Sequence, residues 1–83
     1  MSYEKVAQAK ARVVIGMKQT LKAMKNGEVE EVLVADDADQ AIKDKVMNVA
    51  DQLQIPVKQV DSMKQLGRAC GIDVRAATVA IKQ

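Results

Sequence analysis

The stretch VEEVLVADDADQAIKDKVMNVADQLQ, residues 29–54, decides the fold. Its opening part, 29–35, is rich in Val and Leu, a composition typical of a strand buried on both faces. The rest predicts a helix over 36–54, because apolar residues recur at spacings of three and four and form one stripe: Ala38, Ile42, Val46, Val49 and Leu53. Asp37, followed three positions later by Gln40, is expected to cap the start of this helix.

Helical and extended segments alternate on both sides of this stretch. Ser62 with Gln65 predicts another helix start, and the Asn26-Gly27 pair and Gly71 predict helix ends. The further helices that we expect cover Tyr3 to about Arg12, Gly16 to about Lys25, and Ser62 to Cys70; the further strands cover 12–15, a short segment headed by Pro56, and Val74–Ile81. This alternation predicts an α/β fold, a three-layer α-β-α sandwich with a small central mixed sheet, as one domain over residues 1–83.

The composition excludes several classes of protein. Without histidine and with one cysteine, the chain has no imidazole-based catalytic triad, no His-ligated zinc and no internal disulfide, which favours a cytoplasmic protein. Neither a signal peptide nor an apolar run long enough to span a membrane is recognisable. Cys70 is expected to be a buried hydrophobic residue. Helix capping and a favourable interaction with the helix dipole explain the aspartates at 36–39 better than metal binding does. We therefore expect no enzyme, no cofactor and no metal site.

Charge is distributed unevenly along the chain. Residues 1–27 hold six Lys/Arg against one Glu, residues 28–61 three Lys against nine carboxylates, and residues 62–83 four Lys/Arg against one Asp. If the first and last segments pack side by side, the molecule has one basic pole, which is an electrostatic footprint for phosphate. A solvated surface with chance clustering of charge is the alternative.

The expected helix after Gly16 is the most informative element. Lys18, Lys22 and Lys25 share one stripe, and Met17, Leu21 and Met24 share another rotated by about 100°, so the helix can bury one row and expose the other. A polyanion would offset the repulsion between the lysines, although an ordinary amphipathic helix explains the row equally well. Gly16 would let a ligand approach the helix start, or is a plain turn glycine, and Gln19 suits a base edge better than a phosphate.

Three further features are ambiguous on sequence alone. Arg12 and Arg75 would extend the basic row, but each is more often a plain surface charge. The segment Ile72-Asp73-Val74 places two aliphatic side chains in an expected loop. They would either cover an unstacked base or tuck back into the core.

Two stretches together resemble a known family. Gly16-Met17-Lys18-Gln19-Thr20-Leu21-Lys22 resembles the Gly-x-Asn-Glu-x-x-Lys signature of the kink-turn RNA-binding ribosomal proteins, the L7Ae family. Leu66-Gly67-Arg68-Ala69-Cys70-Gly71-Ile72 resembles the Leu-Gly-x-Ala-x-Gly segment of the same family. The resemblance extends over essentially the whole chain and is strongest to short bacterial members of the YbxF type.

The resemblance implies a function in RNA recognition. It implies that residues matching Lys18, Gln19 and Lys22 read guanine edges at tandem sheared G·A pairs, with Gly16 allowing close approach. It further implies that Ile72, Asp73 and Val74 cover the bulge. Arg12 and Arg75 are candidate extensions of the interface on their charge and position, and Val74-Arg75 differs from the loops of many relatives. Lys18 and Gln19 replace the Asn and Glu of archaeal and eukaryotic members, so binding should depend more on phosphate and on salt.

The expected partner is RNA that contains kink-turns, in ribosomal RNA or structured mRNA leaders. The protein would act as a monomer, in the cytoplasm and away from membranes. The alternative is a protein–protein adaptor of the same fold that does not bind RNA.

Overall fold

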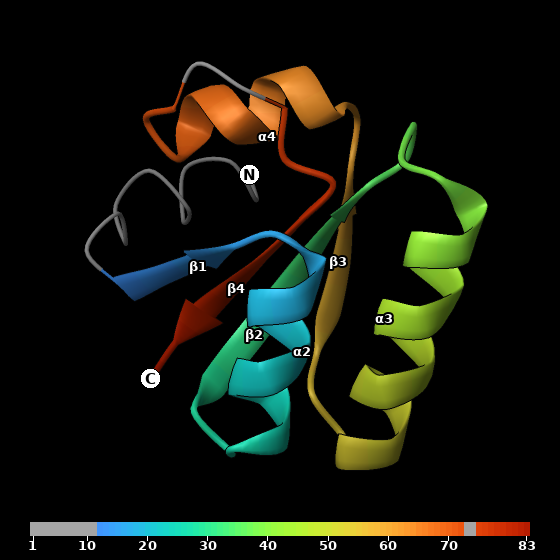
Figure 1. The fold of residues 1–83 in the computed structure, drawn as a ribbon, viewed down its shortest axis with the longest axis vertical. Helices are drawn as coiled ribbons and strands as arrows, with labels where there is room; N and C mark the ends of the chain where they lie inside the picture. The colour runs from blue at the N-terminus through green and yellow to red at the C-terminus, as the bar shows by residue number, and fades with distance from the viewer. Residues whose placement is uncertain (1–11, 73–74) are drawn as a thin grey trace.

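The fold is built on a four-stranded mixed sheet, seen in a computed structural model that describes residues 12–72 and 75–83 (Figure 1). The strands are β1 (Val13–Ile15), β2 (Val29–Ala35), β3 (Val57–Val60) and β4 (Thr78–Lys82), and their order in the sheet is β1-β4-β2-β3. β4 pairs antiparallel with β1 and β2, whereas β2 and β3 are parallel and are joined through a helix. The helices are α2 (Met17–Lys25), α3 (Gln40–Leu53) and α4 (Met63–Ala69).

The central strand β2 is buried as its composition predicts. Every residue of β2 except Glu30 is buried, and its side chains alternate between the two faces of the sheet. Val32 and Val34 pack in the cluster formed with α2 and α3, while Leu33 and Ala35 pack in the cluster formed with α4. A strand with apolar contacts on both faces needs helices on both faces.

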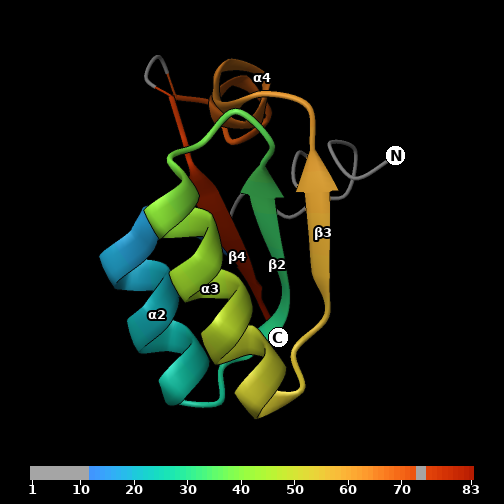
Figure 2. The same ribbon diagram turned by 90° about the vertical axis from the view of Figure 1, so that its right-hand side faces the viewer.

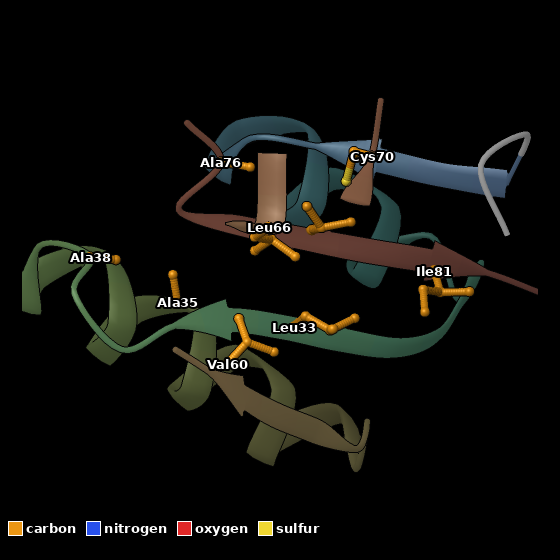
Figure 3. Packing of buried hydrophobic residues seen from close by; sticks show 9 residues of the cluster. Leu33, Ala35, Ala38, Val60, Leu66, Cys70, Ala76 and Ile81 are labelled. Atoms are coloured by element: carbon orange, nitrogen blue, oxygen red, sulfur yellow. The ribbon is translucent and has the colours of Figure 1, made fainter. Parts of the chain in front are cut away.

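Among the described residues, helices cover the two faces of the sheet unequally. Figure 2 shows α2 and α3 side by side on one face, and α4 lies on the other side, near one end of the sheet. Leu66 of α4 and Cys70, which follows the helix as its C-cap, pack with Leu33 and Ile81 of the sheet (Figure 3). The predicted three-layer α/β sandwich with a mixed sheet is confirmed.

The start of α3 differs from the expectation. Asp39, not Asp37, is the capping residue: its side chain accepts a hydrogen bond from the Ala41 amide at 3.3 Å, and the helix begins at Gln40. Asp37 instead accepts a hydrogen bond from the Met63 amide at 2.8 Å, across 26 residues of sequence. Both aspartates lie close enough to the helix start to cap it. Asp37 is instead bonded to Met63, which is distant in sequence, and Asp39 is the cap.

The last strand is shorter than predicted. It begins at Thr78 rather than Val74, because the Ala76 amide donates to the Met63 carbonyl at 3.1 Å and so holds the segment against the start of α4. The helix predicted from Tyr3 falls on residues 1–11, outside the described residues. The Ser62 cap is confirmed, since its hydroxyl accepts from the Gln65 amide at 3.1 Å.

The predicted helix ends are also confirmed. Gly27 has φ of 73°, and after it the Glu28 amide donates to the Ala23 carbonyl at 3.1 Å, which closes α2 in a Schellman arrangement. Gly71 has φ of 80° and follows α4 in the same way, with the Ile72 amide donating to the Gly67 carbonyl at 3.1 Å.

Candidate functional site

Four connecting segments meet at one edge of the sheet. Since β1 and β2 are both antiparallel to β4, they run in the same direction, and β3 runs with them. Their last residues therefore lie at one edge, where β4 begins (Figure 1). This edge gathers Gly16, the loop 36–39, residues 61–62 and the segment 75–77, and we call it the loop edge.

Gly16 joins α2 to β4 at the loop edge. Its amide donates to the Thr78 carbonyl at 3.1 Å, and its own carbonyl accepts from the Thr20 amide at 2.9 Å. Gly16 precedes α2 with φ of 98° and ψ of 155°, a region open essentially only to glycine. A Cβ at this position would meet no atom within 4 Å, so the glycine also leaves open space beside the helix start.

The outer surface of α2 carries the predicted polar row. Lys18, Gln19, Lys22 and Lys25 are exposed, whereas the other side of the helix is buried through Thr20, Leu21, Ala23 and Met24. The separation of lysines from apolar residues is therefore confirmed, except that Met17 is half-buried. The amides of the first turn, which a helix cannot pair within itself, lie at the Gly16 end of this row, where a negatively charged group is favoured.

A shallow hollow extends along the side of α2 that faces β1 and β4. It has a volume of about 160 Å³ and is lined by Val14, Gln19, Lys22, Ala23, Asn26, Glu28 and Lys82. Asn26 and Lys82 were not among the site residues predicted from the sequence. The spacing of Gln19, Lys22 and Asn26 at three and four could have indicated Asn26, but Lys82 enters only through strand pairing.

Arg12 lies apart from the loop edge. It precedes β1, at the end of that strand away from Gly16, and its guanidinium donates to the Lys82 carbonyl at 3.2 Å. Lys82 in turn lies 3.8 Å from the Glu28 carboxylate, in an exposed ion pair of small energetic weight. Arg12 therefore belongs with the far end of the hollow rather than with the helix start.

The structure describes only part of the second candidate segment, which is Ile72-Asp73-Val74 with the neighbouring Arg75. Ile72 is half-buried and packs against the core cluster around Leu66, so its side chain is at least partly tucked inward. Arg75 is exposed at the loop edge. Asp73 and Val74 lie outside the described residues.

The basic pole that the segment charges predict carries both positive and negative side chains in the structure. The basic segments do pack together, because β1 pairs with β4. However, the loop 36–39 brings three exposed aspartates, Asp36, Asp37 and Asp39, to the loop edge as well. Among the described residues, the loop edge therefore carries both signs of charge, whereas the exposed lysine row of α2 contains no carboxylate.

The remaining side chains of the described residues offer no evident catalytic or metal-binding group. Cys70 is buried, as predicted, and burial raises the pKa of its thiol, which makes it a poor nucleophile. Within residues 12–72 and 75–83, no group of three His, Cys, Asp or Glu side chains is placed to hold a metal ion. None of the described helices is long and apolar enough to cross a membrane.

Comparison with known proteins agrees with this architecture. Over residues 1–83 the chain matches the family described as ribosomal protein L7Ae/L30e/S12e/Gadd45. The fold and this match define the class, and the chain belongs to that family.

Several relatives are similar over nearly their full length. An RNA-binding protein of Halalkalibacterium halodurans is 59% identical over 83 residues, covering 100% of both chains. The RNA-binding protein YbxF of Geobacillus stearothermophilus is 58% identical over 81 residues, covering 98% of both. Among solved structures, the 15.5kD RNA binding protein of Giardia lamblia aligns with a TM-score of 0.93 at 25% identity, covering 99% of this chain and 71% of that one.

Proposed function

We propose that this chain is a non-enzymatic RNA-binding protein that recognises and stabilises kink-turns in structured RNA. One observation carries the proposal: the hydrogen bond from the Gly16 amide to the Thr78 carbonyl. It joins the start of α2 to the strand that follows the Ile72–Arg75 region, so segments about sixty residues apart meet at one edge. The names of the relatives, which are RNA-binding proteins, support the same class of partner.

In this proposal α2 makes the main contact. Its start enters the groove at the tandem G·A pairs, with open space at Gly16 for the approach of a base edge. Gln19 offers both a donor and an acceptor to guanine, while Lys18 and Lys22 contact guanine edges or nearby phosphates. Ile72, Asp73 and Val74 cover the bulge, and Arg75 lies beside them.

The proposed mechanism is a shift of population. The protein binds the bent form of the RNA more tightly than the extended form, and so increases the bent fraction. We propose that it does so as a monomer in the cytoplasm, on ribosomal RNA or mRNA leaders. No step in this mechanism requires a catalytic group or a cofactor.

A titration tests the proposal directly. The chain is titrated with a short kink-turn RNA and with a control in which the tandem G·A pairs are replaced by Watson–Crick pairs, each at two salt concentrations. We expect tight binding to the kink-turn and a large loss on the control. Equal, salt-sensitive binding to both RNAs would leave only attraction between lysines and phosphate.

A protein–protein adaptor is the second candidate function. It is favoured by two exposed apolar side chains on α3, Met47 and Leu53, which are 40% and 45% exposed. Met47 also lines a hollow of about 500 Å³ between α3 and β3, together with Asn48, Asp51, Ile55 and Val57. Absence of binding to both RNAs in the titration would favour this role.

A further inference from the structure

The Asp37 carboxylate connects the loop 36–39 to the start of α4. Its Oδ1 accepts a hydrogen bond from the Met63 amide at 2.8 Å. Met63 is the first residue of α4, so its N–H is one of the donors that the helix itself cannot satisfy. The Ser62 cap serves the Gln65 amide instead, which leaves the Met63 amide to Asp37.

Further backbone hydrogen bonds, beginning at the carbonyl of the same residue, connect Met63 to the proposed binding region. The Met63 carbonyl accepts from the Ala76 amide at 3.1 Å, and two residues further the Thr78 carbonyl accepts from the Gly16 amide. A second bond, from the Ala35 amide to the Ala77 carbonyl at 2.9 Å, fixes the same segment against the end of β2. The Asp37 side chain therefore begins a series of hydrogen bonds, and the last bond in the series, from Gly16 to Thr78, lies at the start of α2.

We propose that Asp37 is a positioning residue for RNA binding, holding the start of α4 and the segment 75–77 in place beside Gly16. This inference rests on the proposed function. Asp37 is exposed at the loop edge, where its negative charge repels phosphate. Its electrostatic and positioning effects on RNA affinity thus have opposite signs, and substitutions can separate them.

Three variants make the separation. Asp37→Ala removes both the charge and the hydrogen-bond acceptor, and Asp37→Asn removes the charge but keeps an acceptor oxygen. Asp36→Ala is the matched control for charge, because the bonds of Asp36 are made by its backbone: its amide donates to the Val60 carbonyl and its carbonyl accepts from Lys43 Nζ. Each variant is titrated with the kink-turn RNA, and hydrogen exchange is measured at the Met63 and Ala76 amides.

The expected results differ in direction. Asp37→Ala should weaken binding by about fivefold and speed exchange at both amides, because the Met63 amide loses its acceptor. Asp37→Asn and Asp36→Ala should bind as tightly as the unmodified chain or slightly more tightly. If Asp37→Ala does not fold, Asp37→Glu keeps the charge but displaces the oxygen, and it too should weaken binding.

Several outcomes would overturn the inference. Binding by Asp37→Ala that equals or exceeds that of the unmodified chain would show that charge alone matters. Equal weakening by Asp37→Asn and Asp37→Ala would show that the acceptor does not matter. If the unmodified chain does not distinguish the kink-turn from its control, the proposed function fails first, and the inference fails with it.

Discussion

Gly16 and Thr78 are joined backbone to backbone, with the Gly16 amide 3.1 Å from the Thr78 carbonyl oxygen. The bond lies where β1 ends and β4 begins, so it continues the pairing of these strands one step beyond the ladder. It fixes where α2 starts relative to the segment 75–77. A glycine is required here because the backbone must turn from strand to helix at φ of 98°.

Replacement of Gly16 tests whether the open space beside it is used. Gly16→Ala should lower the free energy of unfolding by about 1–3 kcal/mol, because the backbone region is strained for any residue with a Cβ. Under the proposed function it should also weaken kink-turn binding, since the added methyl group projects where a base edge would approach. Stability is measured by denaturant unfolding followed by circular dichroism, and affinity by titration of the folded variant.

Gly27→Ala provides the matched control for this variant. Gly27 also has a positive φ, 73°, and a Cβ there would likewise meet no atom within 4 Å, but it lies at the other end of α2. It should cost about 1–2 kcal/mol of stability and leave RNA affinity unchanged. Equal losses of affinity in the two variants would mean that the space at Gly16 is not part of the interface.

Lys22→Ala tests the exposed row on α2. The variant should lose about tenfold in kink-turn affinity, because a charge-assisted contact is removed. The slope of log affinity against log salt concentration should also become shallower by about one phosphate contact if Lys22 reaches a phosphate. Lys45→Ala, an exposed lysine of α3, is the control and should change neither quantity. Similar losses in both variants would indicate attraction to overall charge only.

Much of the fold could be predicted because it is encoded locally. The apolar strand at 29–35, the Ser62 cap and the glycines after α2 and α4 each depend on a few neighbouring residues. The roles of Asp37 and Asp39 could not be separated locally, since both are caps by type and the choice depends on Met63. The contact of Arg12 with Lys82 could not be predicted for a related reason: it follows from the register of β1 against β4, which pairs residues far apart in sequence.

Asp39→Ala tests the corrected helix start. Since Asp39 caps α3, its loss should lower the free energy of unfolding by about 0.5–1 kcal/mol. RNA affinity should change by less than about twofold, because the bond of Asp39 stays within α3 and the removed charge is negative. Unfolding in urea and titration with the kink-turn RNA give the two values. An affinity loss as large as that of Lys22→Ala would contradict the placement of the interface on α2.

Chemical labelling of Cys70 tests the packing of α4. Because burial raises the pKa of the Cys70 thiol, the folded protein holds less of the reactive thiolate than the unfolded chain at the same pH. Alkylation by iodoacetamide should therefore be roughly tenfold or more slower in buffer than in urea, and the single cysteine makes the readout unambiguous. The raised pKa of the Cys70 thiol also sets the sign of a pH dependence. The stabilisation from burying the neutral thiol is complete below the pKa of the thiol in the unfolded chain, and it is lost as pH rises towards the pKa of the thiol in the folded protein. Rapid labelling of the folded chain, at the rate seen in urea, would mean that α4 does not hold Cys70 against Leu66 and the sheet.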